Sequence, residues 1–125
     1  MHETEDTIAF LDIKPLFHGH VLVIPREHHV TLGELPPVLV PKLFAVAQLI
    51  SVAVEGAMGA QGTFVAMNNR VSQSVPHLHV HVVPRTKGDG LKGFFWPRHA
   101  YADETERAAV AARIRELAAP REDRG

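Results

Sequence analysis

Short apolar and β-branched runs bounded by turn residues, one of which alternates with histidine, predict several short strands. These lie at residues 7–13, 20–25, 62–68 and 77–83. The first two are joined by a turn from Pro15 to Gly19, which indicates an antiparallel pair. The last strand alternates histidine with apolar residues, so its polar side chains share one face and its apolar side chains the other.

Residues 37–58 repeat apolar side chains at the three-and-four spacing of a helix. The predicted buried face comprises Leu43, Val46, Ala47, Ile50, Ala53, Val54 and Ala57. The opposite face is apolar as well, which either a subunit interface or a fully buried helix would explain. Its residues are Phe44, Leu49 and Val52.

Residues 103–118 are predicted as an amphipathic C-terminal helix. Its apolar side carries Val110, Ile114 and Leu117, and arginines and glutamates occupy the rest. Together the elements predict an α+β fold in which helices back an antiparallel sheet.

Composition and charge bear on the number of domains and exclude several classes of site and partner. A length of 125 residues with 46% apolar content favours a single domain, which we place at residues 1–118 with a flexible tail at 119–125. The absence of cysteine excludes disulfides, thiolate nucleophiles and cysteine-rich zinc sites. A net charge of −1 provides no overall attraction to the phosphate backbone of a nucleic-acid polymer, so we expect no such partner. The apolar runs are shorter than a membrane span and residues 1–10 lack a secretory pattern, so we expect a cytoplasmic protein without a membrane partner.

His77, His79 and His81 lie on one face of the last predicted strand. A core disfavours three polar rings in a row, because each buried ring needs a hydrogen-bond partner. The groups titrate near neutral pH, so the stripe indicates a functional site.

Two chemistries use such a stripe. His-x-His on a strand supplies two ligands for zinc or iron, but no acidic residue follows within seven positions and Arg85 would repel a cation. Further ligands would have to come from Asp12, His20, His28 or His29. Alternatively, a neutral imidazole attacks phosphorus, and its neighbours stabilise phosphoryl oxygens and assist the leaving group.

The order His-φ-His-φ-His-φ-φ, where φ is apolar, spans His77 to Val83 and resembles the signature of the histidine-triad (HIT) nucleotide-binding family. Gln73-Ser74-Val75-Pro76 resembles the segment before that signature. A second stretch runs from Ala9 to Pro15 and from Gly19 to Pro25 in the family's order. The resemblance covers roughly residues 7–100 and is closest to the nucleotide-binding and dinucleoside-polyphosphate-cleaving branches. It implies a sheet of about five antiparallel strands, a long helix and a C-terminal helix.

The resemblance also implies roles for individual residues. His79 would be the nucleophile, His81 would contact the phosphate and help the leaving group, and His77 would orient the nucleophile's loop. The fourth catalytic histidine would be His20. Asp12 would bind the ribose hydroxyls. Apolar walls for the base would come from Phe10, Ile13 and Leu22, and polar contacts near the phosphate from Asn68, Gln73 and Ser74.

From this resemblance we expect an enzyme that cleaves at the α-phosphate of a purine nucleoside phosphoramidate or dinucleoside polyphosphate through a nucleotidyl-histidine. No cofactor is expected, apart from a divalent cation that accompanies polyphosphate substrates, and the expected assembly is a homodimer. The alternatives are a nucleotide sensor with little catalysis and a metal-dependent enzyme using the histidine stripe. The family usually carries a strand and a short helix before the position of Thr7, and we expect neither in this chain.

Overall fold

The computed structural model describes residues 1–91 and 97–118. It divides into two compact units, Met1–Asp89 and Gly90–Gly125, which are described separately below. The tail predicted at 119–125 lies outside the described residues. A single domain over 1–118 therefore stays a prediction.

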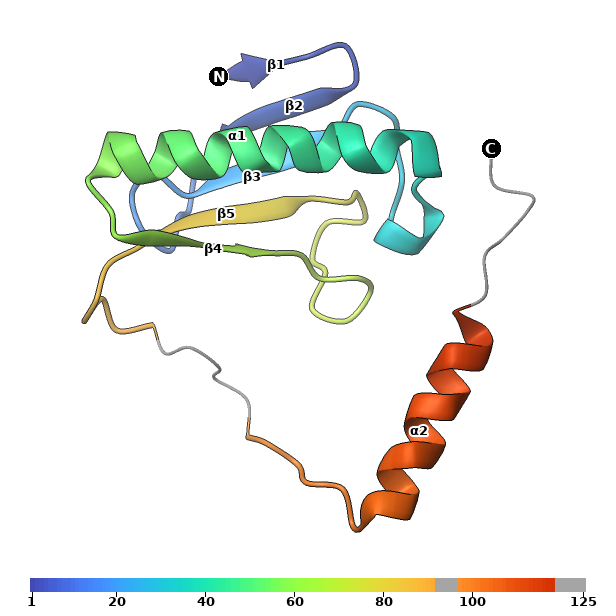
Figure 1. Cartoon of the computed structure of the whole chain (residues 1–125). Helices are drawn as coiled ribbons and strands as arrows, with labels where there is room; N and C mark the ends of the chain where they lie inside the picture. Colours follow the sequence, from blue (N-terminus) through green and yellow to red (C-terminus); the bar gives the residue numbers. More distant parts are fainter. Residues whose placement is uncertain (92–96, 119–125) are drawn as a thin grey trace. The chain divides into compact units, whose positions relative to one another are not determined.

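The first unit is built on one open sheet of five antiparallel strands (Figure 1). In spatial order these are β1 (His2–Glu3), β2 (Thr7–Leu11), β3 (Val21–Pro25), β5 (Val80–Arg85) and β4 (Gly62–Ala66). All four neighbouring pairs are antiparallel, including the β2–β3 pair expected from the turn between them. The α+β prediction with about five antiparallel strands is confirmed.

The strand β1 corrects one expectation. We expected no strand before Thr7, but His2 pairs with Ala9 and Glu3 pairs with Ile8. The Thr4 amide then donates to the Thr7 carbonyl oxygen over 2.9 Å and closes the turn between the two strands. A strand of two residues has no periodicity of its own, so the sequence pattern could not reveal it.

One helix covers one face of this sheet. Two short 3₁₀ helices, η1 (Leu32–Glu34) and η2 (Pro37–Leu39), lead into α1 (Val40–Met58), so the helix predicted at 37–58 begins with a 3₁₀ turn. Gly59 ends α1 in the left-handed region at φ 60°. The core between helix and sheet is apolar, and its central members are Ala9, Val21, Val23, Val80 and Val82 from the strands and Leu43, Val46, Ala47, Ile50 and Val54 from α1.

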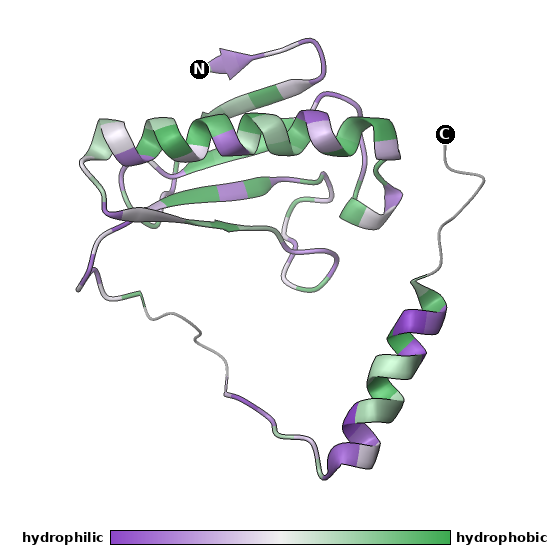
Figure 2. Cartoon of the chain, in the orientation of Figure 1, coloured by the Kyte–Doolittle hydropathy of each residue, from purple (hydrophilic) through white to green (hydrophobic). Residues whose placement is uncertain are grey.

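The outer face of α1 stays exposed. Leu49 is 53% exposed and Val52 is 70% exposed, whereas the third residue predicted for this face, Phe44, is partly buried against the core. In the view of Figure 2, green hydrophobic segments make up much of the visible side of α1. A fully buried helix is therefore excluded within this unit, and a subunit interface stays a prediction.

The length and composition of Pro37–Met58 would also suit a membrane span, with a mean hydropathy of 1.9. This corrects the expectation that every apolar run is too short. The same segment serves as the core helix here, because its inner side chains pack on the sheet.

The second unit contains α2 (Glu104–Leu117), close to the helix predicted at 103–118. Asp103 caps it: the side-chain Oδ1 accepts from the Glu106 amide over 2.8 Å. Glu106 in turn accepts from the Ala102 amide over 3.3 Å. No residue of α2 is buried, so its predicted apolar side is exposed.

Candidate active site

The face of the sheet opposite α1 carries the site. Three residues lie side by side in register on neighbouring strands: Phe10 pairs with Leu22, and Leu22 pairs with His81. Their sequence neighbours Ala9, Val21 and Val82 point into the core, so period-two alternation places this row on the other face. The sheet therefore presents an apolar surface next to an imidazole.

This row forms part of a cleft of about 410 Å³. The cleft is lined by Phe10, Asp12, Leu22, Ile24, Ser74, Val75, His77, His79 and His81. Its apolar wall comes from β2, β3 and Val75, and its polar residues gather around the histidines. This arrangement suits a ligand that has a flat apolar part and an anionic part.

The three histidines share one face, although regular strand pairing begins only at Val80. His77, His79 and His81 are partly exposed, whereas Leu78, Val80 and Val82 are fully buried. The alternation predicted from the sequence therefore extends two residues before β5. The rings of His79 and His81 lie with centroids 5.1 Å apart, close enough to act on one ligand group.

His79 is held in one tautomer. Its Nδ1 lies 2.7 Å from the carbonyl oxygen of His77, and a carbonyl oxygen can only accept a hydrogen bond. The Nδ1 therefore carries the proton, and the neutral ring keeps its lone pair on Nε2. A nucleophile requires this arrangement.

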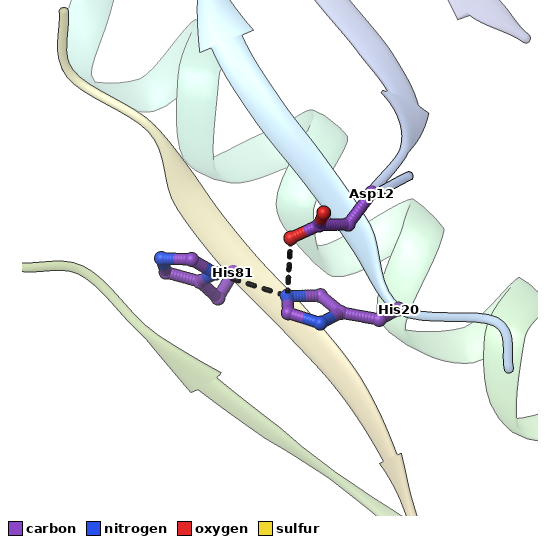
Figure 3. A group of neighbouring side chains, drawn as sticks. All are labelled: Asp12, His20 and His81. Carbon is purple, nitrogen blue, oxygen red and sulfur yellow. Dashed lines mark hydrogen bonds and ion pairs between the residues drawn. The ribbon is translucent and has the colours of Figure 1, made fainter. Parts of the chain in front are cut away.

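His81 is held in the opposite tautomer by a chain of hydrogen bonds. The Leu16 amide donates to Nδ1 of His20 over 3.1 Å, so the proton of the neutral His20 ring lies on Nε2. That Nε2 lies 2.9 Å from Nδ1 of His81 and donates to it (Figure 3). The neutral His81 ring therefore carries its proton on Nε2 and can donate it to a ligand.

Asp12 stands beside this chain. Its Oδ2 lies 3.8 Å from Nε2 of His20, and its Oδ1 accepts from the Lys14 amide over 2.9 Å. The second bond forms the local turn that ends β2 at Leu11, two residues earlier than predicted. The carboxylate thus has a structural bond and also lines the cleft.

Burial lowers the pKa of both His20 and His81, the two histidines joined by this hydrogen bond. The pKa of His20 is lowered mainly by burial, against an opposing attraction from Asp12. The pKa of His81 is lowered by burial first and then by repulsion from His20 and His79, again opposed by Asp12. Both rings therefore favour the neutral form that the hydrogen bonds require.

His77 closes one side of the cleft through a clasp with His28. Nε2 of His77 donates to the Pro25 carbonyl over 2.9 Å, and Nε2 of His28 donates to the Pro76 carbonyl over 2.8 Å. Their rings meet edge to face with centroids 5.2 Å apart. The pair joins the end of β3 to the segment before β5. That His77 orients the segment of a nucleophilic His79 stays a prediction.

The loop before the triad is held both by its own residues and by the segment after β3. Gln73 donates from Nε2 to the Val30 carbonyl over 2.6 Å and accepts the Arg70 amide on Oε1 over 2.9 Å. Asn68 donates to the Ser72 carbonyl over 3.3 Å. Two residues of this loop, Arg70 and Ser72, have positive φ values of 72° and 62°. The loop is therefore held in a conformation that few side chains adopt freely.

Most of the predicted site residues come together, but four do not line the cleft. His20 is buried behind His81 and acts on the cleft through it. Gln73 and Asn68 are engaged with the loop backbone. Ile13, predicted as a wall of the base pocket, is 93% exposed and lies outside the cleft.

Three residues that contribute here were not predicted. Ile24 lines the cleft, and period-two alternation from Leu22 along β3 would have found it. Val75 lines the cleft from the loop, and His28 forms the clasp. Neither carries a periodic signal, because both positions depend on how irregular segments fold.

Asp12, His20 and His81 also offer three possible metal-ligand atoms within 4.8 Å of one another. A cation on Nε2 of His20 would replace the proton there. Because Nδ1 of the same ring accepts from Leu16, the ring would lose both protons and become an imidazolate. The hydrogen bonds of His20 therefore disfavour a cation at this cluster.

Comparison with known proteins identifies relatives of the chain. The HIT domain family model matches residues 1–88. An adenylylsulfatase of Arabidopsis thaliana is 37% identical over 93 residues, which is 73% of this chain and 47% of that protein. The asymmetrical bis(5'-nucleosyl)-tetraphosphatase of Schizosaccharomyces pombe is 34% identical over 70% of this chain and 50% of its own length. The chain thus spans about half the length of these two curated relatives.

A third relative is covered more fully. The adenosine 5'-monophosphoramidase of Schizosaccharomyces pombe is 32% identical over 85% of this chain and 78% of its own length. The names of all three relatives describe hydrolases that act on nucleotides.

Solved structures of similar sequence have the same fold. A HIT family protein from Bacillus subtilis superposes with a TM-score of 0.86 at 30% identity, covering 97% of this chain and 88% of that one. SMU.412c from Streptococcus mutans gives a TM-score of 0.85 at 35% identity, covering 94% of this chain and 74% of that one. With the family model matching most of the chain and the histidines set side by side on one sheet face, the protein belongs to the HIT domain family.

Proposed function

We propose that the protein is a nucleotide hydrolase that cleaves at the α-phosphate of a purine nucleoside phosphoramidate or dinucleoside polyphosphate through a covalent nucleotidyl-His79. The observation that carries this proposal is the Nδ1–H bond of His79 to the His77 carbonyl, since it leaves the Nε2 lone pair free in a ring that lines the cleft. The named activities of the three relatives support the same substrate class.

The reaction proceeds in two displacements. In the first, Nε2 of His79 forms a bond to the α-phosphorus as the bond from phosphorus to the leaving group breaks. His81 donates Nε2–H to an oxygen of the phosphoryl or leaving group, where negative charge develops. In the second, water forms the new P–O bond, the P–N bond to His79 breaks, and the water proton passes to solvent. The products are a nucleoside monophosphate and the free leaving group.

The remaining cleft residues bind the nucleoside. Asp12 accepts from the two ribose hydroxyls, since a carboxylate has lone pairs left beyond its bond to Lys14. The base packs against Phe10, Leu22 and Ile24, and Ser74 contacts the phosphate. The covalent step requires no cofactor, although a divalent cation can accompany a polyphosphate substrate.

The proposed assembly is a cytoplasmic homodimer. The exposed apolar outer face of α1 supports an interface, because Leu49 and Val52 would otherwise remain in water. Sedimentation of the purified chain tests the oligomeric state: a monomer at micromolar concentration would contradict it.

Turnover in ¹⁸O-water tests the proposed reaction. The full chain is incubated separately with adenosine 5'-phosphoramidate, diadenosine tetraphosphate and adenylyl sulfate, and the products are analysed by mass spectrometry. We expect adenosine monophosphate with one ¹⁸O on phosphorus from at least one substrate. Tight nucleotide binding without turnover of any of them would instead support a sensor and refute the hydrolase.

A further inference from the structure

The hydrogen-bond chain from Leu16 through His20 to His81 runs in one direction only. The Leu16 amide can only donate, so Nδ1 of His20 accepts, Nε2 of His20 donates, and Nδ1 of His81 accepts. We propose that His20 is a positioning residue that keeps His81 a neutral Nε2–H donor throughout the reaction, rather than an imidazolium that delivers a proton. This inference rests on the proposed function and specifies how His81 acts in it.

With all hydrogen bonds intact, one proton lies between Nε2 of His20 and Nδ1 of His81, and a second proton lies on Nε2 of His81. An additional proton on His81 would have to occupy Nδ1, which already accepts from His20. An additional proton on His20 would have to occupy Nδ1, which already accepts from Leu16. Either protonation therefore breaks a buried hydrogen bond, because His20 is only 3% exposed.

Loss of the Nε2 proton is opposed as well. If His81 gave up that proton, it would have to take the shared proton onto Nδ1 to stay neutral. His20 would then carry no proton on either nitrogen and become an imidazolate. The ring of His81 therefore donates a hydrogen bond but keeps the proton.

The charged and titratable groups around His81 agree with a neutral ring. It faces His20 from the turn before β3, His79 from the segment just before β5 and Asp12 from the turn after β2. Burial lowers the pKa of His81, repulsion from His20 and His79 lowers it further, and the attraction of Asp12 only partly opposes them. Asp12 lies nearer to His20, at 3.8 Å from Nε2, where it favours the proton that His20 already holds.

Leaving groups differ in whether they need a proton in addition to the hydrogen bond from His81. A leaving group that departs as a stable anion, such as a polyphosphate, a sulfate or a carboxylate, needs only the hydrogen bond from His81. An amine leaving group needs a proton as well, and that proton must come from water. The site therefore handles anionic leaving groups without any proton transfer from the protein.

Imidazole nitrogen NMR tests the proposal directly. In the full chain labelled with ¹⁵N-histidine, long-range proton–nitrogen spectra report which nitrogens of each ring carry protons. From about pH 6 to about pH 8 we expect His81 with an unprotonated Nδ1 and a protonated Nε2. A doubly protonated His81, or a proton on Nδ1, at about pH 7 would overturn the proposal. The spectra need no turnover, so they decide this point even if the hydrolase proposal fails.

A matched pair of variants tests the role of His20. The amide of His20→Gln can accept from Leu16 and donate to His81, whereas the carboxylate of His20→Glu can only accept. At about pH 8 we expect His81 to keep its Nε2–H tautomer in His20→Gln and to move its proton to Nδ1 in His20→Glu. Nucleotidyl transfer should stay within about tenfold for the first variant and fall about 100-fold or more for the second, the scale for losing one donor to a developing oxyanion. Equal rates and equal tautomers in the two variants would refute the positioning role.

Discussion

Nδ1 of His79 donates to the carbonyl oxygen of His77 over 2.7 Å, so the ring of His79, the proposed nucleophile, is oriented by the backbone two residues earlier. His77 is in turn held by the Pro25 carbonyl at the end of β3. The three alternating histidines thus have different hydrogen-bonding roles. His77 fixes the backbone, His79 is fixed by it, and His81 is fixed from the far side by His20.

The apolar wall gives the first prediction. Replacing Ile24 by alanine removes three carbons from the cleft, and each buried methylene contributes about 0.8 kcal/mol. If the base covers all three carbons, the KM for adenosine substrates should rise about 50-fold, and about tenfold if it covers half of them, with little change in kcat. Ile13→Ala is the matched control, because Ile13 is 93% exposed outside the cleft and its loss should leave KM unchanged. Equal effects of both changes would contradict the assigned wall.

Asp12 gives the second prediction. Asp12→Ala should raise the KM for ribonucleotides about tenfold or more, because two hydrogen bonds from the ribose hydroxyls to a charged group are lost. The 2',3'-dideoxy analogues cannot make these bonds, so their KM should change little. An equal rise for both sugars would show that Asp12 acts only through the turn it forms with Lys14.

Gly19 gives the third prediction, on stability. Its φ is 95°, and an added Cβ would lie 2.6 Å from Cγ of Met58. Gly19→Ala should lower the free energy of unfolding by about 2–4 kcal/mol, from strain plus overpacking. Gly59→Ala, with φ 60° and nothing within 4 Å of the added Cβ, should cost about 1–2 kcal/mol from strain alone. Urea unfolding measures both.

The clash at Gly19 can be separated from the strain. Adding Met58→Ala to Gly19→Ala removes the clash with the Met58 side chain, so the double variant should recover part of the stability relative to the sum of the single changes. Strict additivity of the two substitutions would contradict the contact.

The fourth prediction concerns pH. Burial lowers the pKa of His20 and His81 in the folded protein below the ordinary value of 6.5. As the pH falls below that value, the unfolded chain takes up protons that the folded chain does not, so stability decreases on acidification. Replacing both histidines by glutamine should flatten the dependence of the melting temperature on pH between about 7 and 5. An unchanged dependence would mean that neither ring is held neutral.

The sequence revealed the shared face of the triad because period two survives even where strand pairing does not. Regular pairing starts at Val80, yet Leu78 is already fully buried and His77 and His79 remain partly exposed. The three-and-four spacing likewise revealed α1, although Ala53 and Ala57 of its predicted buried face are exposed. Periodicity did not reveal the two-residue β1, since it is defined only by its pairing with β2.

The roles of the loop residues could not be obtained in the same way. Gln73 looked like a ligand contact, but both ends of its amide bind loop backbone at Val30 and Arg70. His28 gave no signal, although it joins two segments that lie 48 residues apart. Amide and imidazole side chains suit ligands and backbone equally well, so their partners depend on how irregular segments pack. The tautomers likewise depend on single partners, such as the Leu16 amide, that no pattern specifies.

The covalent intermediate on His79 is the central claim and the fifth prediction, and an intact-mass measurement tests it most directly. The full chain is mixed with excess adenylyl substrate and quenched within milliseconds, and its intact mass is measured. His79→Ala is the test variant, and His99→Ala is the matched control, because His99 is exposed and does not line the cleft. We expect an added adenylyl mass that vanishes in His79→Ala, stays in His99→Ala, and maps by fragmentation to His79. Turnover that persists in His79→Ala would contradict the account.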